Sequence, residues 1–329
     1  MSDERVLVTG GTGCIGSWVV RNLVQEDVPV VVLSVDRQFD RLKLVLTDTE
    51  FERVDFLITD IVEIEAIEAA ARSHEVNRII HLAAMQFPFC AADPIRGAQV
   101  NVAGTVTIFE LARRLGIHGV VYASSAAVYG PASRYPDTVL PPDAPFFPTS
   151  HYGVYKVANE QTARVYWESH GISSIGLRPH SVYGPGRDQG VTSRPTLAMI
   201  AAAAERPYHV TFGGRYQFQF ADDVARTFIR AARVTNEGAA AYNLGGSTHG
   251  VDEILRTIEA QEPAVRGRLS NDDRPLPFPE AFDGGPIAEA LGSLVETPLE
   301  DGVRLTIETY RTGLRTGVID EAFLDRVLA

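Results

Sequence analysis

Two side chains that can do chemistry together, Tyr152 and Lys156, lie four positions apart. On a helix this spacing stacks both residues on one face, so a phenol lies beside an ammonium group. A nearby cation favours the ionised phenol, whose ordinary pKa is ~10. A phenol activated in this way can act as a general acid or base near neutral pH. Tyr155 lies close by, but the residue four positions after it is Asn159.

A second pattern lies near the N-terminus, where Gly10, Gly13 and Gly16 follow one another at intervals of three. An apolar run precedes this segment and a helical pattern follows it. Such a turn requires positive φ and close backbone approach, and the helix that follows offers free N–H groups to a pyrophosphate. The pattern predicts a dinucleotide cradle made by these glycines together with Cys14 and Ile15.

The choice between NAD and NADP depends on the residues that follow the second apolar run. Ser34 lies 24 positions after Gly10, where an NAD enzyme places a carboxylate against the ribose hydroxyls. Asp36 can reach that ribose, whereas Arg37 can favour the extra phosphate of NADP. A solvated charge pair in a loop fits these two residues equally well. Both cofactors stay open, with a slight preference for NAD.

Short β-branched runs alternate with amphipathic stretches in the first half of the chain. The runs are residues 5–9, 29–34, 54–58, 78–82, 119–124 and 173–177. This alternation predicts an α/β fold with a Rossmann-type, doubly wound parallel sheet, whose ligands lie beyond the carboxyl ends of the strands. We expect a first domain over residues 1–178 and a smaller, mixed, substrate-binding region over 179–329, from which some strand and helix segments return to the first domain. Proline-dense residues 131–148 and 263–286 are predicted to be loops.

Polar and small residues stand at the ends of the third, fourth and fifth strands. Those expected against the adenine and the central part of the cofactor are Asp60, Ile61, Leu82, Ala83 and Ala84. His81 has two open interpretations, a neighbour of the cofactor or a buried histidine with satisfied hydrogen bonds. The fifth strand delivers Ser124 and Ser125 to the same edge as the glycine turn.

These motifs together resemble the extended short-chain dehydrogenase/reductase family, which contains nucleotide-sugar epimerases and dehydratases. The resemblance spans about residues 4–245 and is carried by the motifs TGGTGCIG, DI, HLAA, NVAGT, SSAAVYG, YGVYK and LRPHSVYGPG. It implies that Tyr152 is the general acid/base, that Lys156 lowers its pKa and holds the nicotinamide ribose, and that Ser125 binds the reacting oxygen. It also implies that Asn101 orders the cofactor site. Family members often dimerise through two helices, which correspond here to residues 94–115 and 152–170, so we expect a homodimer.

The sequence departs from this family at positions that bear on the substrate. Dehydratases usually have Thr-Asp-Glu where this chain has Ser125 followed by two alanines, so elimination of water is not expected. Nucleotide-sugar epimerases usually have asparagine at the position of Ser181, and Arg215 is one residue out of register with the arginine that grips diphosphate. These departures favour a substrate without a nucleotide.

The leading hypothesis is therefore an NAD(P)-dependent oxidoreductase that transfers a hydride at a carbinol or carbonyl of a sugar-like or other polar, non-nucleotide substrate. A nucleotide-sugar 4-epimerase is the alternative, and a non-catalytic dinucleotide-sensing protein is an alternative of another class. Side chains proposed to contact the substrate are Gln86, Ser124, Ser125, His151, His180, Arg187 and Arg215.

The composition and net charge of the chain argue against several classes of partner. The 329 residues carry 30 basic and 42 acidic side chains, a net charge of −12, without a long basic run, which argues against nucleic acid and anionic membranes as partners. The eight histidines are scattered, so no metal site is expected. The two cysteines, and the lack of a signal-like or 18-residue apolar segment, favour a cytoplasmic protein that does not span a membrane.

Overall fold

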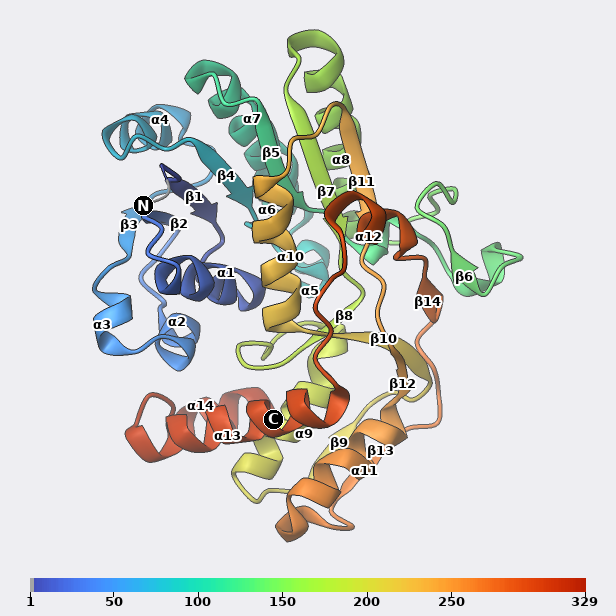
Figure 1. Cartoon of the computed structure of the whole chain (residues 1–329). Helices are drawn as coiled ribbons and strands as arrows, with labels where there is room; N and C mark the ends of the chain where they lie inside the picture. Colours follow the sequence, from blue (N-terminus) through green and yellow to red (C-terminus); the bar gives the residue numbers. More distant parts are fainter. Residues whose placement is uncertain (1–2) are drawn as a thin grey trace.

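A seven-stranded parallel sheet forms the centre of the structure, a computed structural model that describes residues 3–329 (Figure 1). Its strands, in spatial order, are β3 (Asp55–Ile58), β2 (Val30–Ser34), β1 (Val6–Thr9), β4 (Arg78–His81), β5 (Gly119–Ala123), β7 (Ser173–Arg178) and β11 (Ala239–Asn243). Strands β1 and β2 are buried along their whole length, as their valine-rich sequences require in a sheet covered on both faces. The strand order reverses between β1 and β4, which creates a crevice at the carboxyl edge.

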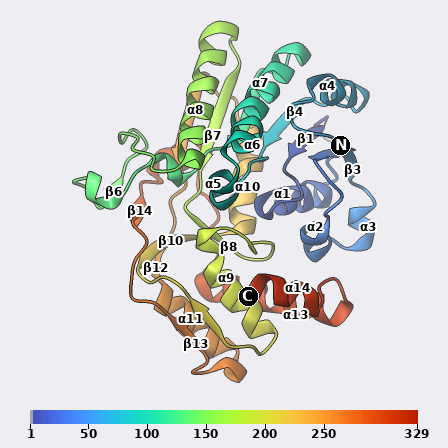
Figure 2. The same cartoon turned by 180° about the vertical axis from the view of Figure 1, so that it is seen from behind.

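Helices cover both faces of this sheet (Figures 1 and 2). One face carries α1 (Cys14–Gln25), α10 (Ala221–Arg233) and α12 (Gly285–Leu291), and the other carries α4 (Ile64–Ser73), α7 (Gly104–Leu115) and α8 (His151–His170). The connections contain the shorter helices α2 (Asp40–Val45), α3 (Asp48–Phe51), α5 (Phe87–Ala92) and α6 (Pro94–Ala98). The predicted doubly wound Rossmann-type fold is confirmed.

All six predicted strands are present, to within a residue at each end, and the sheet contains one more. Strand β11 has the sequence AAAYN, which lacks β-branched residues and so gave no strand signal. It pairs with β7, although it lies after residue 178. Helix α10 also belongs with the sheet, because its buried Val224 and Phe228 share a core with Trp18 of α1.

The remaining elements lie below the sheet in Figure 1 and enclose a second core. Three strands pair in the order β12 (Thr248–Gly250), β10 (Arg215–Phe220) and β8 (Ser181–Tyr183), and β9 (Tyr208–Val210) pairs with β13 (Leu269–Asn271). The helices are α9 (Arg194–Ala203), α11 (Val251–Gln261), α13 (Leu299–Thr316) and α14 (Glu321–Leu328). Their shared core includes Met199, Val251 and Tyr310, all fully buried.

The two proline-dense stretches are not simply loops. Each contains a two-residue strand, β6 (Val139–Leu140) and β14 (Ala281–Phe282), and these strands pair in parallel. Leu140 and Phe282 are buried together with Val128 in a small core of their own. The second stretch also contains β13, which pairs with β9, and α12 begins at its end. The expectation of loops was wrong at these three strands and at the start of α12, because long-range pairing and shared apolar contacts outweighed the local proline signal.

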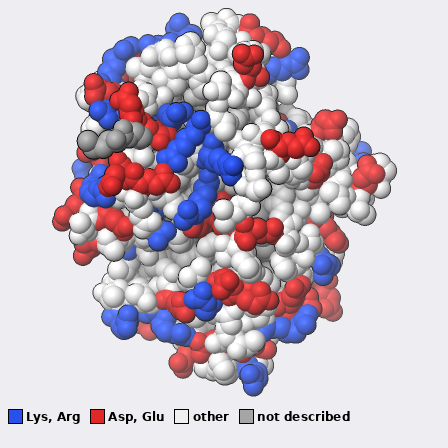
Figure 3. Space-filling model, in the orientation of Figure 1, with Lys and Arg blue, Asp and Glu red and all other residues white. Residues whose placement is uncertain are grey.

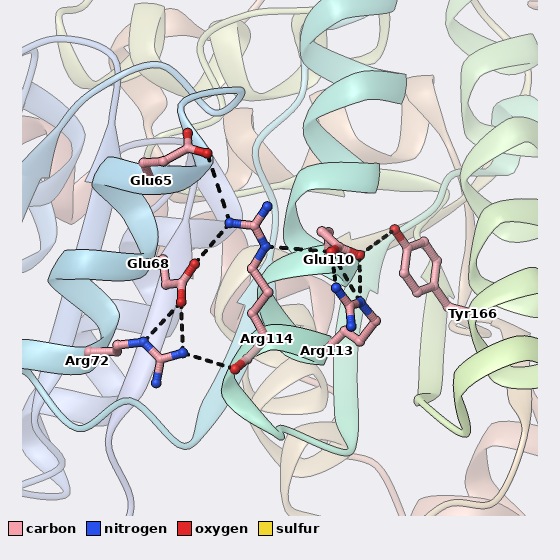
Figure 4. A network of polar contacts seen from close by, with 7 residues as sticks. All are labelled: Glu65, Glu68, Arg72, Glu110, Arg113, Arg114 and Tyr166. Atoms are coloured by element: carbon pink, nitrogen blue, oxygen red, sulfur yellow. Dashed lines mark hydrogen bonds and ion pairs between the residues drawn. The ribbon is translucent and has the colours of Figure 1, made fainter.

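A chain of charged contacts braces the outer helices α4, α7 and α8 (Figure 4). Arg114 of α7 approaches Glu65 and Glu68 of α4, at 4.0 and 3.0 Å, and also Glu110 on its own helix. The hydroxyl of Tyr166 on α8 then donates to Glu110 at 3.5 Å. Exposed pairs of this kind are individually weak, so their role is to link the three helices at the surface.

Figure 3 shows a basic cluster near the middle of one face, over α10, with acidic side chains beside it. Two of the three α10 arginines form ion pairs, Arg233 with Glu4 and Glu26 and Arg226 with Asp222, while Arg230 donates to the Ser293 carbonyl at 2.7 Å. Only part of the basic charge of α10 is therefore neutralised by neighbouring carboxylates. Within residues 3–329, no helix combines the length and the apolar character that crossing a membrane requires.

Candidate active site

A cavity of about 1010 Å³ lies at the carboxyl edge of the sheet and reaches into the second core region. It is lined by the glycine turn after β1, by the ends of β2 to β5, by the start of α8 and by residues 179–192 and 276–278. This is the crevice in which doubly wound proteins bind their ligands.

The glycine turn has the geometry that a pyrophosphate cradle needs. Gly10 has a φ of +69°, and a Cβ there would lie 2.6 Å from the backbone nitrogen of Ala83. A Cβ on Gly16 would collide with the Gly10 carbonyl oxygen. At Gly13, which precedes α1, the nearest described atom to an added Cβ is that same oxygen at 3.2 Å, so the space in front of Gly13 is open. Burial raises the pKa of the adjoining Cys14 thiol to about 11, so this residue is neutral.

The residues at the end of β2 and just after it differ in whether they line the cavity. Ser34 and Asp36 line the cavity, and the carboxylate of Asp36 accepts a hydrogen bond from the backbone N–H of Gln38 at 3.0 Å. Arg37 is exposed and is not among the residues that line the cavity. Asp36, and not Arg37, therefore lies at the edge of the cavity.

The residues after β3 and β4 lie at the same edge, as expected. The cavity is lined there by Asp60, Ile61, Leu82, Ala83 and Ala84. Asp60 is held by Arg96 of α6 at 2.5 Å.

His81 is a buried histidine with satisfied hydrogen bonds. Its two ring nitrogens contact the hydroxyls of Thr9, at 2.7 Å, and Thr105, at 3.1 Å. Burial, with a smaller contribution from the Lys156 charge, lowers its pKa to about 3, so it stays neutral.

Asn101 lies behind the residues that line the cavity. It lies in a π-helical turn (Gln99–Ala103) between α6 and α7, is fully buried and does not line the cavity. Its amide accepts from the Met85 N–H at 2.8 Å and donates to the Met85 carbonyl at 3.0 Å. It thereby fixes the segment after β4, in agreement with an ordering role.

The start of α8 carries the expected tyrosine and lysine. Ser150 caps the helix, since its hydroxyl accepts from the Gly153 N–H at 3.1 Å. Tyr152 and Lys156 both line the cavity, and the Lys156 Nζ lies 5.6 Å from the Tyr152 ring centre. The same Nζ donates to the Ala123 carbonyl at the end of β5, at 2.6 Å. Tyr155 faces elsewhere and donates to the Pro94 carbonyl at 2.8 Å.

The pKa of the Tyr152 phenol differs from the expectation. Burial raises the pKa of the Tyr152 phenol above its usual value, although the nearby Ser125 hydroxyl and the charge of Arg187 oppose this rise. Lys156, which was expected to lower that pKa, is not among the groups that do so. Burial lowers the pKa of Lys156 itself to about 8, and Cys90 and Glu160 oppose this fall.

A buried polar network that was not predicted from the sequence holds the Ser124 hydroxyl. The Ser124 hydroxyl donates to Glu160, which also accepts from Arg178 at 2.7 Å. Glu160 follows Lys156 by four residues and therefore continues the same helix face, a signal that the spacing rule contained. Ser124 and Ser125 both line the cavity.

Some of the residues proposed to contact the substrate line the cavity, and others do not. Gln86, His180 and Arg187 line the cavity, whereas His151 and Arg215 do not. His180 is held by the Pro279 carbonyl at 2.9 Å, and burial lowers its pKa to about 4.

Arg215 and His151 lie outside the cavity because of the positions that they take at the starts of β10 and α8. Arg215, at the start of β10, is exposed and donates to the Thr248 carbonyl, while the next residue, Tyr216, faces the core. This alternation is what turns the Arg215 side chain away from the site. His151, the first residue of α8, is exposed and stacks on Tyr155.

Aromatic residues at the cavity also escaped the sequence reading. Phe87 and Phe89 of α5, and Phe278 from the second proline-dense stretch, line it and remain 37–45% exposed. No local pattern links residue 278 to a site built near residues 125 and 152. Within residues 3–329, no group of three His, Cys, Asp or Glu side chains is arranged to hold a metal ion.

The motifs, the fold and the cavity agree with a comparison against known proteins. The model of the NAD dependent epimerase/dehydratase family matches residues 6–245. The chain belongs to this family. It is thus an enzyme of the epimerase/dehydrogenase kind, and the interpretation as a non-catalytic sensor is set aside.

Three relatives illustrate the relationship. The UDP-glucose 4-epimerase of Mycolicibacterium smegmatis is 30% identical, over 93% of this chain and 98% of the relative. The UDP-glucose 4-epimerase of Azospirillum brasilense is 29% identical, over 96% and 94%. The crystal structure of Thermus thermophilus UDP-glucose 4-epimerase, in complex with NAD, has a TM-score of 0.78 and 25% identity, covering 94% of this chain and all of that one.

Proposed function

We propose that this enzyme uses NAD to transfer a hydride at a carbinol carbon of a sugar-like substrate that carries no nucleotide. The observation that carries the proposal is that Ser125, Tyr152 and Lys156 line one cavity together with the glycine turn. Acid–base groups and a cofactor cradle are what a reversible carbinol oxidation needs in one place.

The residues of the cradle fit a dinucleotide. An added Cβ at Gly13 would point into open space that a pyrophosphate can fill, beside the free N–H groups at the start of α1. Asp36 lines the cavity and Arg37 does not, which supports NAD over NADP, because a carboxylate would repel a 2′-phosphate. The complex of the Thermus thermophilus relative with NAD points the same way.

The chain's own residues supply the proton chemistry. Ser125 hydrogen-bonds the carbinol oxygen, and Tyr152, once its phenol is ionised, takes the hydroxyl proton in the oxidation direction and returns it in the reduction direction. Ser125 and Arg187 favour that ionised form against the effect of burial. Lys156 keeps one N–H on the Ala123 carbonyl, which leaves two donors for the hydroxyls of a ribose. A nicotinamide bound there accepts or returns the hydride.

The proposed substrate class follows from the charges around the cavity. A diphosphate needs several cations or donors, since an unpaired buried charge costs several kcal/mol. Arg215 lies outside the cavity, and the hydroxyl of Ser181 is already 3.0 Å from the His180 ring nitrogen.

A second candidate is a nucleotide-sugar 4-epimerase. The observation in its favour is that the Mycolicibacterium smegmatis and Azospirillum brasilense relatives bear that activity and match more than nine-tenths of this chain. An epimerase returns the hydride to the same substrate and keeps its cofactor through the cycle, whereas a dehydrogenase exchanges it.

One experiment separates the two candidates. The purified enzyme is given NAD or NADP with free sugars, sugar acids and hydroxy acids, and reduction is followed at the absorbance of the reduced nicotinamide. In parallel, UDP-glucose is incubated with the enzyme and the C4 stereochemistry is read by NMR. Net reduction of NAD by a free sugar or acid, lost in Tyr152→Phe, supports the proposal. Interconversion of UDP-glucose with no net reduction would replace it by the second candidate.

A further inference from the structure

The cations that line the cavity differ in how they are paired. Arg41 forms an ion pair with Asp188 at 2.6 Å, and Arg96 pairs with Asp60 at 2.5 Å. Among the cavity-lining residues that the structure describes, Arg187 is the arginine without a carboxylate at ion-pair distance. It is therefore the arginine whose charge is available to a ligand.

The Arg187 guanidinium is also short of hydrogen-bond partners. One terminal nitrogen donates to the Thr192 hydroxyl at 3.2 Å, but the Nε is buried and has no partner. A buried N–H of a charged group is costly to leave unsatisfied. The Nε is enclosed by protein, so the donors within reach of a ligand are those of the two terminal nitrogens, and only one of these has a protein partner among the described residues.

The position of Arg187 indicates which group of a ligand lies near its guanidinium. The segment that carries it rests on the first turn of α1, where the Trp18 indole donates to the Pro185 carbonyl at 3.0 Å. The Arg187 charge lowers the pKa of both Cys14, in the glycine turn, and Tyr152. Arg187 therefore lies near both the pyrophosphate cradle and the proposed acid/base.

On one side the guanidinium packs closely against Gly190 and Gln86. A Cβ on Gly190 would lie 2.6 Å from the Gln86 Oε1 and 3.1 Å from an Arg187 terminal nitrogen. Gly190 has a φ of +98°, so its backbone needs glycine as well. Gln86, Gly190 and Arg187 thus share one small polar corner of the cavity.

We propose that Arg187 binds an oxyanion at the junction between the cofactor cradle and Tyr152. The proposal rests on the function proposed above and extends it to the chemistry of the ligand. Two sources offer the same chemistry, the pyrophosphate of the dinucleotide and a carboxylate on the substrate close to its reacting carbon. The guanidinium group of an arginine suits both, because its two parallel N–H donors match two oxygens of a phosphate or a carboxylate.

The test compares Arg187→Met, which keeps the length of the side chain without its charge, with Arg187→Lys, which keeps a charge. Arg194→Met is the matched control, because Arg194 lies seven residues later, donates to the Tyr208 hydroxyl at 2.8 Å and does not line the cavity. Melting temperatures show that each variant is folded. Calorimetric titration then measures NAD, followed by D-glucuronate and D-glucose on the NAD-loaded protein; these sugars differ in a carboxylate at C6.

Two results support the proposal and identify the source. A loss of NAD affinity of about 10- to 100-fold in Arg187→Met, the size expected for a charge-assisted hydrogen bond, indicates the pyrophosphate, with Arg187→Lys recovering part of it and Arg194→Met unchanged. Unchanged NAD affinity, together with a preference for D-glucuronate over D-glucose that Arg187→Met abolishes, indicates a substrate carboxylate.

Other results overturn it. If Arg187→Met binds NAD and D-glucuronate as the unmodified enzyme does, the side chain is structural only. If the unmodified protein binds no dinucleotide at all, the proposed function fails first. The oxyanion proposal is then decided by titration with inorganic pyrophosphate, and equal or absent binding by the unmodified protein and Arg187→Met refutes it.

Discussion

Glu160 and Arg178 form a two-armed ion pair beneath the carboxyl end of β5. Both arms measure 2.7 Å, and the two side chains are 6% and 4% exposed. The pair joins helix α8 to β7, and Glu160 also accepts from the Ser124 hydroxyl. Arg178 reaches further, to the Pro142 carbonyl in the first proline-dense stretch at 2.7 Å. One buried pair thus connects the helix, the sheet and the segment over the cavity.

Breaking this pair on one side is expected to destabilise the enzyme strongly. Arg178→Met leaves the Glu160 carboxylate buried without its partner, which costs about 3–5 kcal/mol of unfolding free energy. The double variant Glu160→Gln/Arg178→Met is expected to lose less than the sum of the single variants. Urea unfolding measures both. Arg164→Ala, which removes an exposed pair with Glu168 on the same helix, is the control and should change stability by less than about 1 kcal/mol.

The glycine turn offers a comparison between two neighbouring glycines. Gly13→Ala is expected to fold normally but lose NAD affinity, because its Cβ meets the Gly10 carbonyl oxygen at 3.2 Å and otherwise fills the cradle. Gly16→Ala is expected to lower the melting temperature, because its Cβ collides with that oxygen within the protein itself. Calorimetry and thermal unfolding separate the two effects. Unchanged NAD affinity in a folded Gly13→Ala would count against the cradle.

The sequence predicted correctly which residues line the cavity where their positions depend on local spacing, and it failed where the positions depend on distant partners. Gly10, Gly13, Tyr152 and Lys156 were found because a turn and one helical turn hold them in place. Arg215 was misjudged, because its direction is set by pairing between β10 and β12, some 35 residues further on. A single sequence carries no periodic signal for contacts of that kind.

The assignment of the acid/base is open to a direct comparison of two tyrosines. Tyr152→Phe is expected to lower kcat by roughly 10²–10⁴-fold while NAD affinity stays unchanged, since its hydroxyl moves a proton and does not hold the cofactor. Tyr155→Phe is the matched control, because that hydroxyl contacts the Pro94 carbonyl and not the cavity. Steady-state kinetics on the substrate found by screening gives the answer. A damaging Tyr155→Phe beside a harmless Tyr152→Phe would reverse the assignment.

The affinity for NAD is expected to depend on pH through Lys156. Burial lowers the pKa of this lysine from 10.5 to about 8, so the ammonium is present below pH 8 and is lost as the pH rises through it. Its donors to a ribose weaken in the same direction, and affinity should fall above pH 8. Glu160→Gln removes one of the two groups, Cys90 and Glu160, that raise this pKa, so the fall should begin at lower pH. Titrations on either side of pH 8 test this, and a flat profile for both proteins would exclude Lys156 as a cofactor contact.

The expected homodimer has a candidate surface on α7 and α8. Val154 and Val165 of α8 are 49% and 56% exposed and lie three helical turns apart on one face, and Val106 of α7 is also exposed. Apolar residues repeated along an outer helix face are typical of a surface that a partner covers. Figure 2 shows both helices on the outside of the sheet.

We expect the enzyme to be a dimer in light scattering coupled to gel filtration, and Val165→Glu to be a monomer, because a buried unpaired carboxylate costs several kcal/mol at an apolar interface. Val295→Glu is the control: Val295 is 60% exposed but lies outside the helices of the sheet, between α12 and α13, so this variant should remain dimeric. NAD affinity should be retained in both variants, since neither valine lines the cavity. A monomeric unmodified enzyme, or a Val165→Glu variant that still dimerises, would show that α8 does not form the interface.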